Sequence, residues 1–249
     1  MDILNILLLF GVGVVAGTLN TLAGGGSLLS LPVLIFLGLP PNIANATNRV
    51  AIVLQNIFAV RGFKSKGVSV YPFNLWLGIS AFLGAIVGAS LAVDINEEVF
   101  NRILAVVIVG VVIYMGWNPF KNIKREENTS KKATIISIII FFFVGIYGGF
   151  IQAGVGYLMI TALTLVNGFS LVKTNSIKVF VALTYTLVAL GIFIYYGIVN
   201  WEFGIPLAIG NATGGWLASR WSVNKGDNWI RLIVMITASA FAVKLFFFN

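Results

Sequence analysis

Cysteine and histidine are both absent from this 249-residue sequence. Their absence excludes disulfide bonds, thiol chemistry and the imidazole groups that bind most transition metals. It also excludes the histidine proton relay that works near neutral pH. We therefore expect no catalytic residue, no metal site and no cofactor, and we expect that the protein is not an enzyme.

Charged residues are scarce as well: they make up 10% of the sequence, whereas 59% of the residues are hydrophobic. A soluble domain carries about 25% charged residues, so this composition predicts an integral membrane protein. The apolar runs are continuous and lack alternating polarity, which favours membrane-spanning helices over a transmembrane barrel. We expect a multi-pass protein whose main surroundings are the lipid bilayer.

The formal net charge of +8 would also suit a nucleic-acid-binding protein. Most of the positive residues, however, lie in short loops between the apolar segments. The positive-inside rule places lysine and arginine in such loops. We therefore expect no nucleic-acid partner.

The sequence contains an internal duplication. Residues 78–92 match residues 204–218 at a constant offset of 126, and the glycine-rich run at 23–26 matches 153–156 at an offset of 130. We divide the chain into a first half (1–120), a cytoplasmic linker (121–132) and a second half (133–249).

The first repeated pair carries Gly84 and Gly88 in one copy and Gly210 and Gly214 in the other. This spacing is typical of surfaces on which membrane helices pack closely. These faces could join the two halves or two protomers, so a homodimer stays open.

Eight apolar segments are long enough to cross a bilayer core about 30 Å thick at about 1.5 Å per residue. They are 3–22, 43–61, 71–93, 99–117, 133–151, 176–197, 201–219 and 229–248. Two shorter pieces, 27–38 and 157–167, take equivalent places in the two halves, as broken helices around a transport site do. The predicted fold class is an all-α polytopic membrane protein with eight full spans and two short broken helices.

The distribution of lysine and arginine favours one topology over another. With eight crossings, nine of these residues lie on the cytoplasmic side and seven outside; with ten crossings the tally becomes thirteen against three. Ten crossings, five in each half, would make the two homologous halves inverted repeats. We favour the inverted arrangement because it follows the positive-inside rule more closely, and the eight-crossing arrangement stays open.

Each half combines a glycine-rich break, a short apolar helix and a second polar cluster that carries a cation. Glycine lets the backbone approach a ligand, and a helix start near Ser27 or Tyr157 presents unpaired N–H groups to an anion. With Arg49 and Lys178, these groups predict a site for a small anionic substrate, although either cation could instead lie at the membrane interface. The predicted substrate-binding residues of the first half are Asn20, Gly24, Gly25, Gly26, Ser27, Asn45, Thr47, Asn48 and Arg49. Those of the second half are Gln152, Gly154, Gly156, Thr174, Asn175 and Lys178.

Acidic residues are missing from the apolar segments, apart from Glu202 at the edge of one of them. Carriers of protons and sodium ions generally use an intramembrane carboxylate or histidine. An anion carrier is therefore favoured over a cation carrier.

Several motifs together resemble the TauE/SafE family of sulfite and organosulfonate exporters. They are GTLNTLAGGGS at 17–27, LPVL at 31–34 and NATNR at 45–49, with the second-half counterparts GGFIQAGVG at 148–156 and KTN at 173–175. The resemblance implies an inner-membrane exporter of small sulfur-containing oxyanions such as sulfite, sulfoacetate or related organosulfonates. The sulfur chemistry comes from the resemblance alone, whereas alternating access between two halves is what a duplicated transporter leads us to expect.

Two other functions use the same residues. An anion channel could have the same lining, and it would differ from a carrier by fast, non-saturating conduction. An intramembrane enzyme could use Ser27 as a nucleophile, but no histidine is present to activate it and no G-x-S-x-G motif surrounds it. We therefore favour the transporter.

Overall fold

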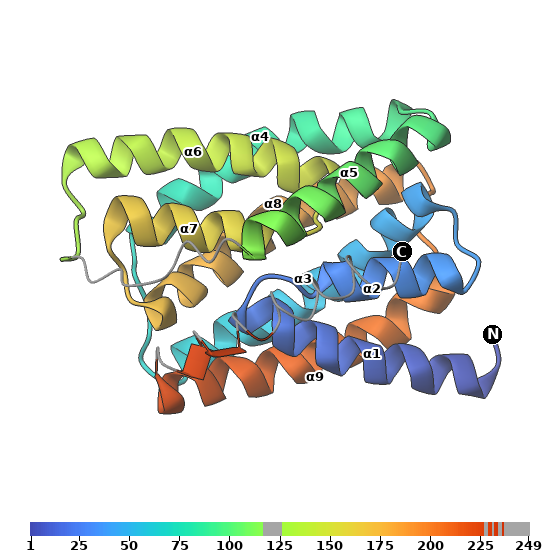
Figure 1. Ribbon diagram of the computed structural model, residues 1–249, viewed down its shortest axis with the longest axis horizontal. Helices are drawn as coiled ribbons and strands as arrows, with labels where there is room; N and C mark the ends of the chain where they lie inside the picture. The colour runs from blue at the N-terminus through green and yellow to red at the C-terminus, as the bar shows by residue number, and fades with distance from the viewer. Residues whose placement is uncertain (117–125, 227–228, 231, 234–235, 237–249) are drawn as a thin grey trace.

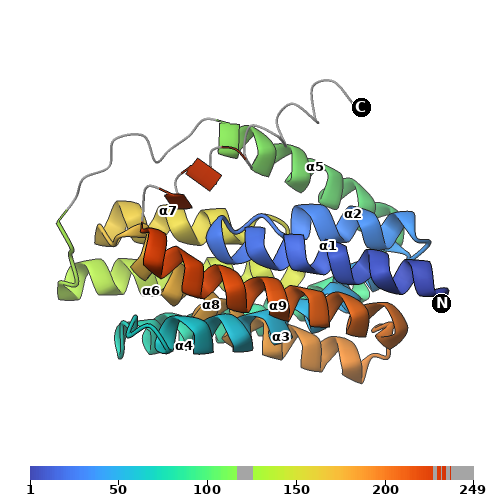
Figure 2. The same ribbon diagram turned by 90° about the horizontal axis from the view of Figure 1, so that it is seen from below.

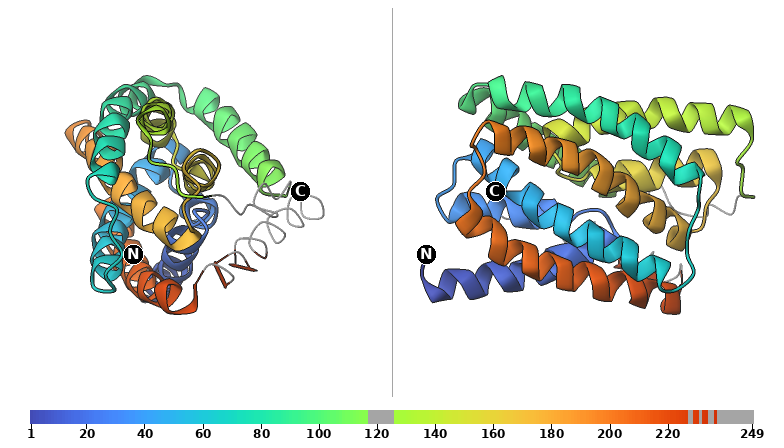
Figure 3. Two further views of the ribbon diagram at one scale, coloured as in Figure 1. Left: turned by 90° about the vertical axis from the view of Figure 1, so that its left-hand side faces the viewer. Right: turned by 180° about the vertical axis from the view of Figure 1, so that it is seen from behind.

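The computed structural model describes residues 1–116, 126–226, 229–230, 232–233 and 236, and within these ranges the chain forms helices and no strands. The helices run side by side along the long axis of the molecule, as the lengthwise view (Figure 1) and the end-on view (Figure 3, left) show. In chain order they are α1 (Ile3–Leu22), α2 (Ser27–Phe36), α3 (Pro41–Lys64), α4 (Phe73–Asp94), α5 (Glu97–Gly116), α6 (Lys131–Phe150), α7 (Val155–Asn167), α8 (Leu171–Tyr195) and α9 (Trp201–Lys225).

The predicted segments correspond closely to these helices. α1 has the predicted bounds, and α2 begins at Ser27 as expected. α8 begins five residues before the predicted segment because the Ser170 hydroxyl accepts a hydrogen bond from the Lys173 backbone N–H at 3.3 Å and caps the helix start. Residues 121–125 of the predicted linker and most of the predicted segment 229–248 lie outside the described residues.

Four of the described helices are long and apolar enough to cross a membrane, namely α1, α4, α6 and α8. Two shorter apolar helices, α2 and α7, occupy the places predicted for broken helices. α3 is 24 residues long but buries Asn45, Asn48, Arg49, Gln55 and Asn56. The structure therefore confirms an all-helical protein with several apolar spans.

The helices form two bundles that exchange one helix between the sequence halves. α9 packs along α1 and α3, and α4 packs along α6 and α8 (Figure 1). One apolar core joins Leu9 of α1 to Leu207 of α9, and another joins Leu77 of α4 to Phe141 of α6. We call α1, α2, α3 and α9 the first bundle, and α4, α6, α7 and α8 the second bundle; α3 and α8 pack against each other between them.

Corresponding helices of the two halves run in opposite directions. α1 starts at the right of Figure 1, beside the marked N-terminus, and runs to the left, whereas α6 starts at the left and runs to the right. The pairs α3 and α8, and α4 and α9, are opposed in the same way (Figures 1 and 2).

The repeated glycines lie where the exchanged helices touch. A methyl group at Gly84 or Gly88 of α4 would overlap backbone of α6, and one at Gly210 or Gly214 of α9 would overlap backbone of α1. The prediction that these four glycines form packing faces is confirmed. The faces are used within one chain, between its two halves.

The two helix breaks meet at the centre of the molecule. Gly24 has a φ of +85° and lies directly against Gly156, so a side chain on either residue would overlap the backbone of the other. α5 covers this crossing with Phe100 and Leu104, which pack in the same apolar cluster as residues of α2 and α7; Figure 2 shows α5 along that side of the molecule. The chain is therefore broken and tightly packed at the same point.

We predict that Gly214→Ala destabilises the protein by about 1–3 kcal/mol because the added methyl group would overlap the Val14 carbonyl of α1. The matched control is Gly191→Ala in α8, where a methyl group would meet no atom within 4 Å. Thermal unfolding in detergent measures both. A Gly214→Ala protein as stable as the Gly191→Ala protein would contradict the close packing of α1 and α9.

Candidate functional site

The side chain of Arg49, a residue of α3, reaches the C-terminal end of α6 and is completely buried. Its guanidinium donates to the carbonyl oxygens of Gly148, of Gly149 at 3.2 Å and of Phe150 at 3.4 Å. It also donates to Gln152 Oε1 at 2.6 Å. A residue of α3 thus caps the helix that ends at the second break.

Lys178, a residue of α8 in the second half, plays the equivalent part at the end of α1 in the first half. Its ammonium donates to the carbonyl oxygens of Asn20 and Thr21, both at 2.9 Å, near the end of α1. Its third hydrogen bond goes to Asn175 Oδ1 at 2.7 Å. A residue of α8 thus caps the helix that ends at the first break, so each half closes a broken helix of the other.

Two asparagines complete this arrangement. Asn45 Nδ2 donates to the Phe150 carbonyl and Asn175 Nδ2 donates to the Leu22 carbonyl, each at 2.9 Å. The last carbonyls of a helix lack intrahelical partners and carry about half a negative charge. In a membrane an unsatisfied carbonyl costs several kcal/mol, so these four side chains stabilise both breaks.

A narrow cavity lies beside the contact of Gly24 with Gly156, between the two bundles. Asn20 and Asn56 line it from the first bundle, and Lys178 and Tyr185 line it from α8. Its other lining residues are Gln152, Val155, Gly156, Met159, Val179 and Ala182. The cavity is thus part polar and part apolar, with one buried cation in its wall.

Four predicted site residues therefore line the cavity: Asn20, Gln152, Gly156 and Lys178. Arg49 is held behind Gln152, which links it to the cavity wall. Gly24 and Gly154 have positive φ at the two breaks, which only glycine adopts readily. A Cβ at Gly25 would lie 3.0 Å from the ring of Tyr157.

The remaining predicted residues lie outside the cavity lining, and several of them join helices. Asn48 accepts from Ser30 Oγ at 2.8 Å and donates to Ser27 Oγ at 3.2 Å, which joins α3 to α2. Thr47 Oγ1 accepts from the Asn200 N–H at 3.0 Å, which joins α3 to the start of α9. Gly26 packs against α1, and Thr174 is buried in the first turn of α8.

Sequence reasoning did not place Asn56 or Tyr185 in the site. Asn56 carried a usable signal, because it is a polar residue within a predicted apolar segment. Tyr185 carried none, because a tyrosine in a membrane protein is most often an interfacial residue, and only tertiary packing brings this one to the cavity.

The charge of the site is positive. Arg49 and Lys178 are both fully buried, and no buried aspartate or glutamate occurs among the side chains that the structure describes. The described residues also contain no cluster of acidic groups that could hold a metal ion. The electrostatics therefore favour an anion.

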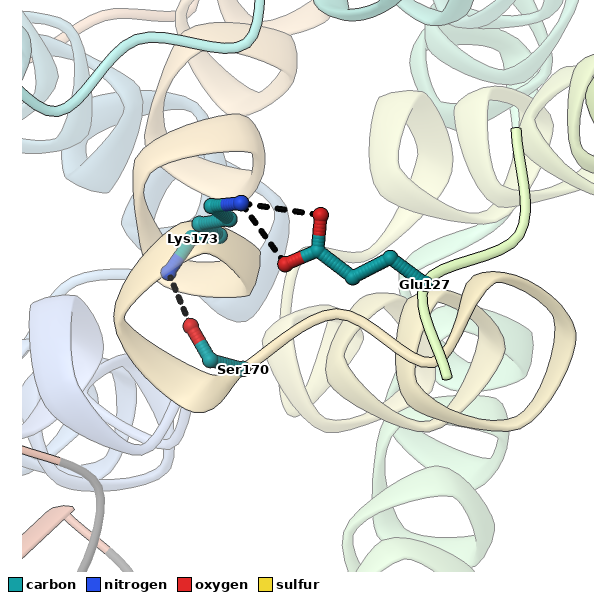
Figure 4. Close-up of polar contacts among 3 residues, drawn as sticks. All are labelled: Glu127, Ser170 and Lys173. Carbon is teal, nitrogen blue, oxygen red and sulfur yellow. Dashed lines mark hydrogen bonds and ion pairs between the residues drawn. The ribbon is translucent and has the colours of Figure 1, made fainter. Parts of the chain in front are cut away.

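Lys173 lies outside this region. Its ammonium pairs with Glu127 at 2.6 and 2.8 Å on the surface, beside the Ser170 cap of α8 (Figure 4). Both side chains are more than two-fifths exposed. Unlike Lys178, this cation has a carboxylate partner and access to solvent.

Comparison with known proteins agrees with this architecture. The chain matches the "Sulfite exporter TauE/SafE" family over residues 9–245. It belongs to this family. No solved structure matches it.

Curated relatives of this TauE/SafE protein are named as transporters. It is 28% identical to "Probable membrane transporter protein" of Haemophilus influenzae, covering 98% of this chain and 95% of that protein. It is also 28% identical to "Probable membrane transporter protein YfcA" of Escherichia coli K12, covering 96% and 88%. "Probable membrane transporter protein ORF9" of a Sinorhizobium species is 24% identical, covering 95% and 90%. The chain is thus a multi-pass membrane transporter.

We predict that Arg49→Ala destabilises this TauE/SafE protein by at least about 3 kcal/mol, because it leaves the last carbonyls of α6 without partners. Arg49→Lys is expected to recover part of the loss, since an ammonium still donates to them. Lys173→Ala is the control and is expected to cost about 0–1 kcal/mol, as an exposed pair does. Thermal unfolding in detergent compares the three. Wild-type stability of Arg49→Ala would show that the end of α6 does not depend on this cap.

Proposed function

We propose that the protein transports small sulfur-containing oxyanions, such as sulfite, sulfoacetate or related organosulfonates, across the inner membrane and exports them. The observation that carries this proposal is Lys178, a fully buried cation without an acidic partner among the described residues, in the wall of a cavity between the two bundles. The family's description as a sulfite exporter supplies the sulfur chemistry.

The size of the local charge supports a singly charged substrate. Arg49 and Lys178 contribute two positive charges, and each of the two helix ends that they cap offsets about half a charge. About one positive charge then remains in a region from which water is largely excluded. A monoanion neutralises it, whereas a sodium ion would increase the repulsion.

We further propose that the two halves are inverted repeats and that transport proceeds by alternating access. The opposite directions of corresponding helices support the first point (Figure 1). The place of the cavity, between the bundles and beside the contact of Gly24 with Gly156, supports the second. Because α4 and α9 are exchanged, the bodies that move would be the two bundles rather than the two halves of the sequence.

In this proposal the membrane part contains eight full spans besides the two broken helices. We also propose that the protein is not an enzyme. Ser27, the one candidate nucleophile, has its hydroxyl bonded to Asn48. The names of the relatives, all transporters, agree with this assignment.

We predict saturable flux of sulfite and methanesulfonate into proteoliposomes that contain the purified protein. Lys178→Met removes the cavity's cation, and Ala182→Leu fills the cavity without removing a polar group. Each is expected to lower the flux at least tenfold, while Lys173→Met, which removes an exposed cation, leaves it unchanged.

Thermal unfolding of each variant is measured first, and flux is interpreted only for variants that are folded. Flux that rises linearly with concentration at very high rates would identify a channel instead of a carrier. No flux of any sulfur oxyanion through folded wild-type protein would place the substrate outside this class.

A further inference from the structure

Two hydrogen-bond donors in the cavity wall have no partner. Asn56 Nδ2 and the Tyr185 hydroxyl are both buried, and neither forms a hydrogen bond of normal geometry within the described part of the chain. The Tyr185 hydroxyl has Gln152 and Thr186 as polar neighbours, and those two side chains bond to each other at 3.4 Å. Both residues line the same cavity. Because burying an unpaired donor costs free energy, the pair indicates that a ligand completes these bonds.

The hydrogen bonds of Lys178 explain why such donors are needed. Its ammonium has three hydrogens, and its three bonds go to the Asn20 and Thr21 carbonyls and to Asn175. Lys178 can therefore attract an anion through its charge, but it has no hydrogen left to donate in this conformation. The direct hydrogen bonds to an anion must come from other residues.

Asn56 and Tyr185 approach the cavity from different bundles. Asn56 belongs to α3 of the first bundle and Tyr185 to α8 of the second. An oxyanion has several acceptor oxygens, so one bound oxyanion can accept a hydrogen bond from both residues at once.

The position of Tyr185 is set by the end of α6. A Cβ at Gly148 would lie 2.9 Å from Cε2 and 3.0 Å from Cζ of the Tyr185 ring, so the ring rests directly on this glycine. The carbonyl of the same residue accepts from Arg49. Arg49 is thus a positioning residue that reaches the cavity through Gly148 and Gln152.

We propose that Asn56 and Tyr185 bind the transported oxyanion directly, one from each bundle, while Lys178 supplies the attractive charge. This inference rests on the proposed function and adds the donor pair that selects the ligand. The anion must have at least two acceptor oxygens, and when it is bound it links the two bundles.

The test uses two matched pairs of variants. Tyr185→Phe removes the cavity hydroxyl, and Tyr157→Phe removes another buried hydroxyl without a partner that does not line the cavity. Asn56→Leu and Asn211→Leu form the second pair, because Asn211 is also buried with an unpaired amide and lies outside the cavity lining. Tyr185→Phe, Tyr157→Phe and Asn211→Leu each lose only unpaired polar atoms and are expected to be at least as stable as the wild type without ligand. Asn56→Leu also loses the long 3.4 Å bond that Gln55 Nε2 donates to Asn56 Oδ1, so it is expected to be within about 1 kcal/mol of the wild type.

Calorimetry and thermal shift with sodium methanesulfonate and sodium sulfite measure binding, with sodium chloride at equal ionic strength as the control salt. Tyr185→Phe and Asn56→Leu are each expected to raise the Kd about tenfold or more, as the loss of one hydrogen bond to a charged ligand does. Tyr157→Phe and Asn211→Leu are expected to bind both anions as the wild type does.

The outcomes separate this inference from the proposed function. If the wild type binds neither anion, the proposed function fails. If it binds them and Tyr185→Phe and Asn56→Leu bind equally tightly, the donor pair is wrong while the proposed function stands. Equal losses in the cavity variants and their controls would also overturn the donor pair, because the effect would then not be specific to the cavity.

Discussion

The rest of the structure depends on a buried cation that closes the end of a broken helix in each half. Arg49 binds the last carbonyls of α6, and Lys178 binds those near the end of α1. A helix that stops inside a membrane leaves carbonyls that neither lipid nor water can satisfy. Because each cation comes from the other half of the chain, the interaction that makes the breaks tolerable also ties the halves together.

The same exchange governs the packing of the long helices. α4 leaves the first half to pack on α6, and α9 leaves the second half to pack on α1, through glycines that bring backbones into direct contact. These contacts form two tight bundles, whereas the cavity and the crossing of Gly24 with Gly156 lie between them. Tight packing within the bundles and a partly polar cavity between them suit a protein in which two rigid bodies move around a bound anion.

The location of the charges also refines what the site can do. The sequence predicts that Arg49 and Lys178 bind an anion beside helix starts. In the structure both side chains instead reach helix ends, where most of their hydrogens are donated to backbone carbonyls. Their charge still acts at short range where the dielectric is low. In the proposed site, attraction and hydrogen bonding are therefore divided between different residues: Lys178 supplies charge, and the unpaired donors belong to Asn56 and Tyr185.

The sequence by itself determined the membrane environment, the duplication, the two short helices and the polar clusters, because these depend on composition and on spacing along the chain. It placed the start of α2 at Ser27 and identified Gly84, Gly88, Gly210 and Gly214 as packing faces. Only the tertiary structure decided which helix each face meets, that the cations cap helix ends, and that Tyr185 reaches the cavity. Those features depend on contacts between residues roughly 35 to 200 positions apart, and no local pattern encodes such contacts.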